Sequence, residues 1–223
     1  MRRFFLTAVL VIGSLAFAHA QSAPAAEQDN YTQVITKRAE KIVSALNITD
    51  SVKFKHVQAI IIDQYRSLSS IHDARNAKVK DIKTADGDDK AKANAETAAV
   101  DSNVDVQLNK LHMHYLAELG TELTPAQVDE VKDQMTYKIL PLTYNAYLDE
   151  LPALTDAQKL QIKAWLIEAR EHAIDAESSE KKHAWFGKYK GRINNYLSAQ
   201  GYDMKKAAED WQKRIQAKQE QKG

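Results

Sequence analysis

The chain has 223 residues, of which 31 are Lys or Arg and 30 are Asp or Glu, and it contains no Cys. The missing thiols exclude a disulfide framework and a thiolate metal site, and the balanced charge excludes a general electrostatic attraction to nucleic acid or to a membrane surface. Once the N-terminal segment considered next is set aside, about 200 residues remain, which is the length of one domain.

The N-terminus has the features of a secretory signal peptide. Two arginines precede an apolar run over residues 4–17, and the small residues Ala18 and Ala20 follow it. The run is shorter than the roughly 20 residues that a membrane-spanning helix needs. We therefore expect residues 1–20 to be cleaved after Ala20, which leaves a periplasmic or secreted protein without a membrane anchor. The string RRFFL also resembles the core of a twin-arginine export signal, so the export route stays open.

The first part of the mature chain predicts two long helices. The composition of residues 21–30 is typical of a flexible leader, and a first helix is predicted over residues 31–46. Thr49 or Asp50 then caps a long helix whose apolar residues follow one seam. The string TADGDD at residues 84–89 turns the chain into another long helix, whose first half has almost no large apolar residue. We expect these two helices to form an antiparallel hairpin that projects from the domain.

Capping and helix-breaking residues divide the rest of the chain into shorter helices. Thr124 and Thr155 each have a Gln three residues later, a pattern that predicts a capping box at a helix start. Pro141 is expected to interrupt the stretch MTYKILPLTYNAYL. Ser178 or Ser179 is expected to start the next helix.

Helix signals recur along the chain, whereas the alternation of apolar and polar residues that marks strands is not sustained. Gly and Pro are scarce, at seven and four residues. We therefore predict an all-α fold, in which residues 31–220 form a single domain of seven to eight helices with a protruding long helical hairpin.

The stretch HAWFGKYKGRINNYL, residues 183–197, separates into three faces on a helix with 100° per residue. An aromatic and aliphatic arc that includes Phe186, Ile193 and Leu197 is expected in the core, and small residues lie nearly opposite. A basic shoulder formed by Lys188 and Arg192 flanks Trp185. Aromatic faces beside Asn and Arg donors suit a sugar ring or an anionic group. The predicted ligand-binding residues are Trp185, Lys188, Tyr189, Arg192 and Asn195.

Two glycines lie inside this predicted helix, Gly187 and Gly191, where each costs roughly 1 kcal/mol relative to Ala. A closely approaching helix, a bound ligand or a break in the helix could account for them. We favour the close helix contact.

Two environments are open for the basic shoulder. Glu168, Glu171, His172 and Asp175 share one face of the preceding predicted helix. This acidic face could pair with the shoulder if the two helices are antiparallel neighbours. Alternatively, the shoulder faces water and forms a groove for a polyanion such as a uronic-acid polysaccharide.

Metal and catalytic patterns are weak. Glu168 and His172 have the spacing of two metal ligands, but two ligands from one helix do not make a site and no HExxH motif is present. His112 and His114 diverge by about 200° on a helix. The chain has no nucleophile-elbow, Walker or dinucleotide-binding motif. We therefore predict no metal site, no cofactor and no catalytic residue set.

Much of the chain resembles a family of exported bacterial helical proteins called domain of unknown function 3826. The resemblance covers residues 38–211 and includes the strings VQAIIIDQYRSLSSIHDAR and LTPAQVDEVKDQMTY, with HAWFGKYKGRINNYL as its most distinctive part. It implies an exported helical protein encoded among genes for polysaccharide utilisation, notably of pectin. It implies no activity and no catalytic residues.

A second, partial resemblance involves the strings LTPAQ and LTDAQ. They are similar to the LTxxQ motif of periplasmic helical chaperones and stress proteins, which are shorter. We interpret this similarity as shared helix-capping residues.

Three functions follow as expectations. The leading one is a non-catalytic saccharide-binding accessory protein, with an acidic oligosaccharide as its partner. The first alternative is an LTxxQ-type chaperone, which predicts a concave apolar surface. The second is an unrecognised polysaccharide-active enzyme such as a lyase, which requires His172 or His183 to meet a Tyr in one pocket.

Overall fold

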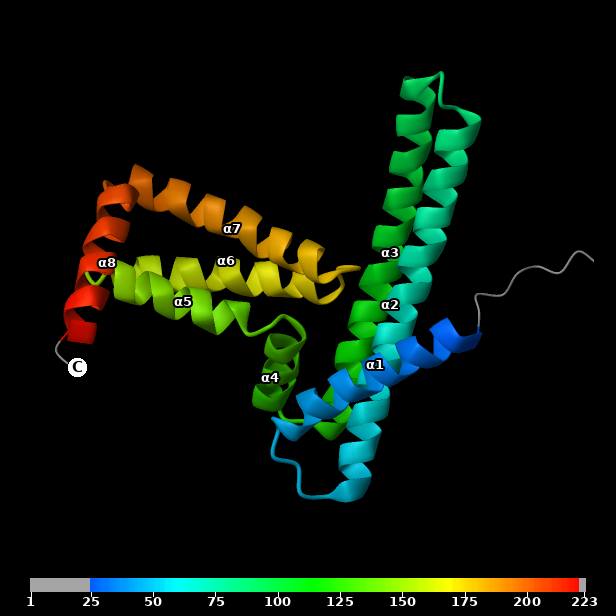
Figure 1. The fold of residues 1–223 in the computed structure, drawn as a ribbon, viewed down its shortest axis with the longest axis horizontal. Helices are drawn as coiled ribbons and strands as arrows, with labels where there is room; N and C mark the ends of the chain where they lie inside the picture. Colours follow the sequence, from blue (N-terminus) through cyan, green and yellow to red (C-terminus); the bar gives the residue numbers. More distant parts are fainter. Residues whose placement is uncertain (1–24, 221–223) are drawn as a thin grey trace, which may run out of the picture. The chain divides into compact units, whose positions relative to one another are not determined.

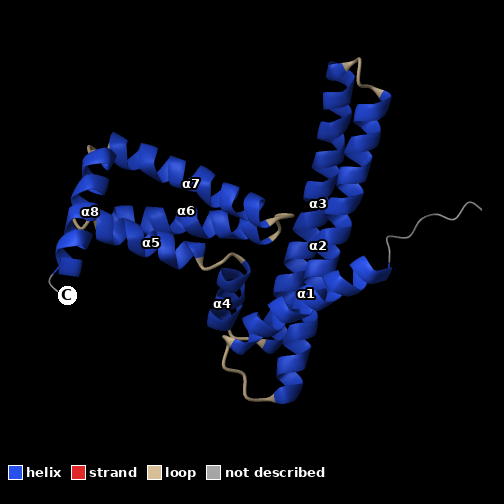
Figure 2. Cartoon of the chain, viewed as in Figure 1, coloured by secondary structure: helices blue, strands red, loops and turns tan. Residues whose placement is uncertain are grey.

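The computed structural model describes residues 25–220, and within this range the chain forms eight α-helices and no strand (Figures 1 and 2). The predicted all-α fold is therefore confirmed. None of these helices is both long and apolar enough to cross a bilayer. The helices are α1 (Ala25–Ser44), α2 (Ser51–Ala85), α3 (Lys90–Glu122), α4 (Pro125–Met135), α5 (Ile139–Glu150), α6 (Asp156–Ile174), α7 (Ser179–Ala199) and α8 (Met204–Glu220).

The chain divides into two units, of which the first ends at Val34. The described part of this unit is the beginning of α1, which starts at Ala25 rather than at the predicted residue 31. The predicted signal peptide over residues 1–20 lies outside the described residues. The second unit, Ile35–Gly223, contains the two apolar cores and the candidate site.

The helix starts follow the capping residues of the sequence. The Asp50 carboxylate accepts hydrogen bonds from the backbone N–H groups of Val52 and Lys53 at 2.8 and 3.1 Å. Thr124 and Thr155 each form a reciprocal capping box with the Gln three residues later. Each of these contacts satisfies N–H groups that have no partner inside the helix. The two LTxxQ strings therefore mark the starts of α4 and α6.

Helices α2 and α3 lie side by side and form the predicted hairpin (Figure 1). At the turn between them, the Asp89 side chain caps α3 by accepting a hydrogen bond from the Lys92 N–H at 3.0 Å. Between Leu68 and Tyr115 the two helices bury only Val79, Ile82 and Ala93. The end of the hairpin near the turn is therefore much less buried than its base.

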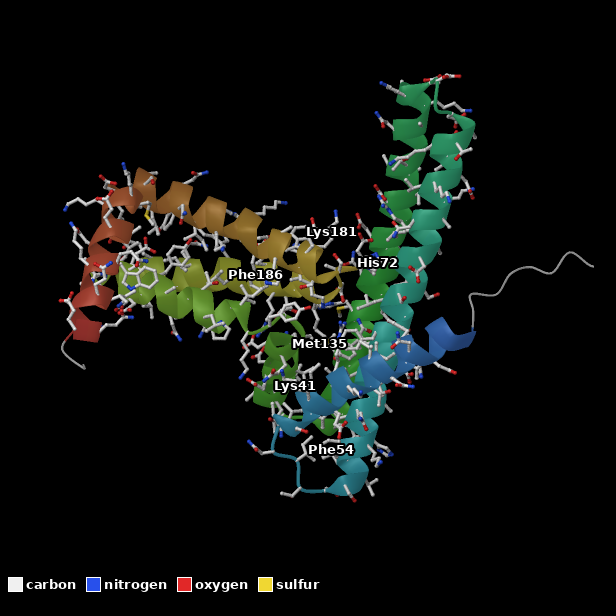
Figure 3. All side chains as sticks on the ribbon, viewed as in Figure 1. Lys41, Phe54, His72, Met135, Lys181 and Phe186 are labelled. Carbon is white, nitrogen blue, oxygen red and sulfur yellow. The ribbon has the colours of Figure 1, made fainter. Side chains whose placement is uncertain are left out.

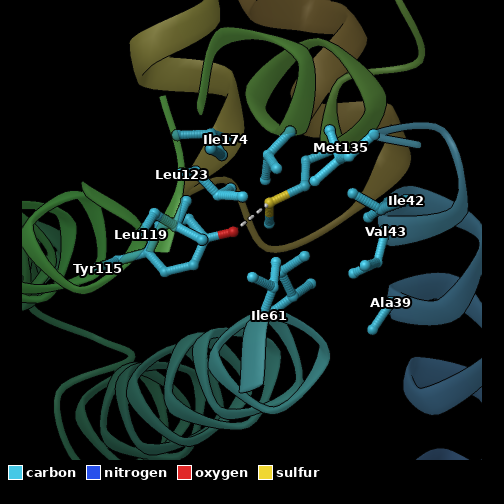
Figure 4. Packing of buried hydrophobic residues seen from close by; sticks show 12 residues of the cluster. Ala39, Ile42, Val43, Ile61, Tyr115, Leu119, Leu123, Met135 and Ile174 are labelled. Atoms are coloured by element: carbon cyan, nitrogen blue, oxygen red, sulfur yellow. Dashed lines mark hydrogen bonds between the residues drawn. The ribbon is translucent and has the colours of Figure 1, made fainter. Parts of the chain in front are cut away.

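Two clusters of buried apolar residues form the interior of the second unit. The first joins α1, the base of the hairpin and α4, and in it the Tyr115 hydroxyl donates to the Met135 sulfur at 3.1 Å (Figure 4). The second joins α5, α6, α7 and α8. Because Ile174 at the end of α6 belongs to the first cluster, α6 contributes to both. Three residues of the predicted core arc lie inside the second cluster: Phe186, Ile193 and Leu197.

The break between α4 and α5 does not lie at Pro141, so that prediction is wrong. Helix α5 begins at Ile139, and Pro141 is its third residue. The first turn of a helix accepts a proline because its backbone N–H groups have no intrahelical partner. The break lies at Tyr137 and Lys138, whose φ angles of 60° and 55° place both in the left-handed region.

A buried lysine joins the ends of two helices. The ammonium group of Lys182 donates to the carbonyl oxygens of Met135, at the end of α4, and Ile174, at the end of α6, both at 3.2 Å. A cation is favourable there because the last carbonyls of a helix lack partners and carry partial negative charge. Burial nevertheless lowers the pKa of Lys182 to about 8. This side chain fixes the start of α7 against both helices.

Candidate functional site

Four helices surround an open cavity of about 670 Å³. Helices α2 and α3 supply one part of its lining, and the end of α6 with the start of α7 supplies the other. His72 of α2 and Lys181 of α7, both labelled in Figure 3, belong to this lining. The lining contains ten titratable side chains, and Trp185 is the predicted ligand-binding residue that it includes.

Trp185 has two partners at the cavity. The His172 ring stacks on the indole with a centroid distance of 4.4 Å and an interplanar angle of 14°. The Lys188 ammonium lies 4.9 Å from the indole centroid, which is a cation–π distance. The structure therefore brings Trp185 and Lys188 together. A ligand in the cavity would meet the indole beside His172, whereas Lys188 is not part of the lining.

The other three predicted residues lie further along α7 and outside the cavity lining. Tyr189 is only 5% exposed and packs in the second apolar cluster. The Arg192 guanidinium lies 4.6 Å over the Trp165 ring and 3.5 Å from the Glu168 carboxylate. Asn195 is exposed. The five predicted residues are thus spread along the helix and do not converge on one pocket.

Gly187 and Gly191 lie on an unbroken α7, and no neighbouring atom lies within 4 Å of the position that a Cβ would occupy at either residue. The predicted close helix contact is therefore wrong, and a helix break is excluded. The reason is that α7 packs on α6 through the face that carries Phe186 and Ile193. The glycine face is exposed.

The acidic face of α6 divides between α7 on one side and α3 and α4 on the other, where Glu171 contacts Lys132 of α4 at 3.0 Å. Glu168 pairs with Arg192 of the basic shoulder, and both side chains are about half exposed. Glu171 and Asp175 point instead toward α3. There His112 contacts both carboxylates, with Nδ1 2.7 Å from Asp175 and Nε2 3.4 Å from Glu171. The pairing of this face with the shoulder therefore involves one of its three carboxylates.

His112 is held as a cation between these two carboxylates. Its hydrogen bonds to Asp175 and Glu171 raise the pKa of His112 to about 9, although partial burial opposes the charge. Burial also opposes ionisation of Glu171, but hydrogen bonds from His112 and Lys132 lower the pKa of Glu171 to about 2. Both ring nitrogens of His112 are therefore protonated donors at neutral pH and are not free to accept a proton.

Helix α2 contributes two further side chains. His72 Nε2 lies 2.8 Å from the backbone carbonyl oxygen of Asp175, at hydrogen-bonding distance. Arg75 Nε donates to the Asp101 carboxylate of α3 at 2.8 Å. The first contact joins the hairpin to the end of α6, and the second joins the two helices of the hairpin.

Other polar groups of the lining are not committed to such contacts. Within the described part of the chain, the lining side chains that make no hydrogen bond or ion pair include Asp105, Asn109 and Lys181. Asp105 and Asn109 are one turn apart on α3, and Lys181 lies in the first turn of α7. They offer a carboxylate, an amide and an ammonium group to a ligand.

The cavity does not bring a histidine and a tyrosine together as a proton-transfer pair. His172 lines the cavity and its ring centroid lies 6.2 Å from that of Tyr189, but among the described residues no tyrosine is part of the lining. Burial and the neighbouring Glu168 raise the pKa of Tyr189 to about 12. A group with this pKa is a poor general base at neutral pH. Residues 25–220 also contain no cluster of three His, Asp or Glu side chains placed to hold a metal ion.

Several lining residues were not predicted from the sequence, because helical periodicity shows which histidines and carboxylates share a face of one helix but not which helices meet. The site instead combines residues from both helices of the hairpin. The predicted turn at residues 84–89 did contain part of the signal, since it pairs residues near 75 with residues near 100. The hairpin residues of the lining that were not predicted as site residues include His72, Arg75, Asp101, Asp105, Asn109 and His112.

The family described as "Protein of unknown function (DUF3826)" matches residues 32–217. The chain belongs to this family. The match includes every residue that lines the cavity and all of α7, so this site lies within the part that defines a DUF3826 protein. No match is found among curated proteins.

Proposed function

We propose that this protein is an exported, non-catalytic accessory protein that binds saccharide in the cavity beside Trp185. The observation that supports the proposal most directly is the combination of an indole with uncommitted polar groups in one cavity of about 670 Å³. Sugar hydroxyls both donate and accept hydrogen bonds, and the C–H face of a sugar ring packs favourably against an aromatic ring. Asp105 can accept, Lys181 can donate and Asn109 can do both.

An acidic oligosaccharide is the proposed partner because exposed cations continue from the cavity along α7. Lys181, Lys188, Lys190 and Arg192 are exposed, and the sequence has no Asp or Glu from residue 181 to residue 202. Of these cations, Arg192 has the nearest carboxylate partner, at 3.5 Å. Exposed pairs of this kind are worth roughly 0–1 kcal/mol, so Arg192 can exchange Glu168 for a ligand carboxylate at little cost.

Two observations favour binding over the alternative functions. His112, the histidine with the strongest carboxylate contacts, has both ring nitrogens engaged, which does not suit a general base. The LTxxQ strings that suggest a chaperone make reciprocal capping boxes at Thr124 and Thr155. Capping accounts for those strings without a chaperone function.

Isothermal titration calorimetry with partially methyl-esterified oligogalacturonides tests the proposal. We expect saturable binding by the wild type and at least a threefold weaker Kd for Arg192→Ala, the loss expected for one exposed charge contact. Lys213→Ala on α8, another exposed cation, is the matched control and should bind as the wild type does. Mass spectrometry of the recovered saccharide should show an unchanged chain length. No heat of binding with the wild type would refute the proposal.

Export is tested separately. Expression in a Gram-negative host should place the protein in the periplasm or medium, with a mature N-terminus at Gln21. A cytoplasmic protein that retains Met1 would contradict the export part of the proposal.

A further inference from the structure

The cavity and the outer face of α7 differ in the sign of their charge. The cavity lining has five carboxylates, whereas its cations are Arg75, Lys181 and the protonated His112. Counted without His72 and His172, the lining is therefore net negative. The exposed face of α7 beyond Trp185 carries Lys188, Lys190 and Arg192 and no carboxylate. A ligand that spans both regions meets opposite electrostatic environments.

The pairing of the charges sharpens this difference. Arg75 is neutralised by Asp101 at 2.8 Å, and His112 is shared between two carboxylates that also belong to the lining. Asp105 has no cationic partner within the described residues. Glu177 contacts the Asn76 amide at 3.5 Å and His72 at 3.9 Å, and it also attracts the Arg75 guanidinium at longer range. Lys181 is thus the single lining cation without a carboxylate partner among the described residues.

A carboxylate bound in the cavity would lose hydration next to Asp105 and Glu177, and like charges held close together are unfavourable. An uncharged sugar residue avoids this cost. Its hydroxyls can donate to Asp105 and accept from Lys181, while its C–H face lies against the Trp185 side of the cavity. Carboxylates elsewhere on the same chain can contact the exposed cations of α7.

We infer that the cavity selects an uncharged sugar residue, and that the acidic groups of the bound oligosaccharide lie outside it, along Lys188 and Arg192 of α7. This inference rests on the proposed saccharide-binding function and adds the chemical class of the residue that occupies the cavity. The protein then recognises a chain that carries uncharged and acidic residues in a fixed order.

A pair of probes that differ in a carboxylate and its methyl ester tests the inference. Galacturonic acid and its methyl ester share one ring and its hydroxyls and carry no second residue that could contact Lys188 or Arg192, and each is titrated into the wild-type protein by calorimetry at low salt. We expect the ester to bind about tenfold more tightly, a difference of about 1.4 kcal/mol. Added salt should narrow the gap, because the carboxylates that disfavour the acid are partly exposed.

Variants locate the origin of the preference. Asp105→Asn keeps the size of the side chain and removes one lining carboxylate, so it should reduce the preference for the ester to about threefold or less. Asp81→Asn, on the exposed surface of α2 away from the cavity lining, is the matched control and should keep the wild-type preference. Circular dichroism and the unfolding midpoint establish that both variants are folded.

The outcomes separate the two ideas. Equal or tighter binding of the acid, or an unchanged preference in Asp105→Asn, overturns the inference and leaves saccharide binding in place. If neither these monosaccharides nor the longer oligogalacturonides bind, the proposed function fails and the inference fails with it.

Discussion

The charges that α6 directs toward α3 and α4 differ from those that it directs toward α7. Arg170 is 5% exposed and contacts Asp129 and Asp133 at 2.6 and 2.8 Å. Glu168, on the opposite side, contacts Arg192 at 3.5 Å, with both side chains about half exposed. The same residue types therefore form a fixed network on one side of the helix and a loose pair on the other. Burial decides which ion pairs stabilise the fold and which remain available for a ligand.

The largest expected effect is the loss of the buried cation. Arg170→Ala leaves the Asp133 carboxylate, which is 16% exposed, without its ion-pair partner and removes one of the three cations around Glu171. We expect the free energy of unfolding to fall by about 3 kcal/mol. Urea denaturation followed by circular dichroism measures this change. A loss below about 1 kcal/mol would mean that the network is no stronger than an exposed pair.

The pH dependence of stability gives the next largest effect. Because the pKa of His112 is raised to about 9 in the folded protein, its charged form stabilises the fold fully below about pH 6.5. This contribution is lost as the pH rises through about 9, and we expect it to be about 2 kcal/mol after allowance for solvent screening. His112→Asn should therefore be less stable than the wild type at pH 6 and should approach it at pH 9.5.

Lys182 makes the comparison with the variant necessary. Its pKa is lowered to about 8, so the folded state favours its neutral form and gains stability as the pH rises from about 8 to 10.5. When only the wild type is measured, this rise in stability with pH opposes the loss of stability that comes from His112. It cancels in the difference between the wild type and His112→Asn. A difference that is independent of pH would show that His112 is uncharged in the folded protein.

The exposed glycines are expected to give a smaller effect of the opposite sign. Gly187→Ala and Gly191→Ala add a Cβ into open space on an unbroken helix. Each should raise the free energy of unfolding by about 0.5–1 kcal/mol, because Ala has the higher helix propensity. Thermal unfolding of each single variant and of the double variant measures this gain. If either substitution lowered the free energy of unfolding, the added Cβ would have to meet a neighbouring group, which contradicts the open space at these positions.

The exposed pair should contribute least to stability. Arg192→Ala is expected to change the free energy of unfolding by less than about 0.5 kcal/mol, because its partner Glu168 is about half exposed. The same denaturation experiment, run beside Arg170→Ala, provides the direct contrast. If the two substitutions lower the free energy of unfolding by the same amount, burial does not determine which ion pairs of α6 stabilise the fold.

Local sequence signals predicted most of the fold. The capping residues Asp50, Thr124 and Thr155 act within three residues of their partners, and the sparse apolar residues of α3 predicted a thinly packed hairpin. The break before α5 was assigned to the wrong residue. Its cause is a backbone reversal at Tyr137 and Lys138, which have no side-chain feature that marks a left-handed conformation.

The candidate site was less predictable because its contacts join residues far apart in the chain. The pattern along α7 identified Trp185, but the partners of that residue depend on how α6 is rotated. Glu171 and Asp175 turn toward His112, more than 50 residues away, and helical periodicity alone does not indicate that choice. The sequence of a helix predicts which residues share a face, whereas the helix that packs against that face is decided by tertiary packing.

The thin interior of the hairpin has a consequence for local opening. Near the turn only Val79, Ile82 and Ala93 are buried, so this end should exchange its amide hydrogens fastest. Opening that starts at the turn reaches the Arg75–Asp101 ion pair before it reaches His72 or His112. That ion pair therefore marks the point at which fluctuations of the hairpin begin to change the shape of the cavity. Protection of the backbone amides from hydrogen exchange should rise from the turn toward Tyr115. When a saccharide is bound, amides nearer the turn should also become protected.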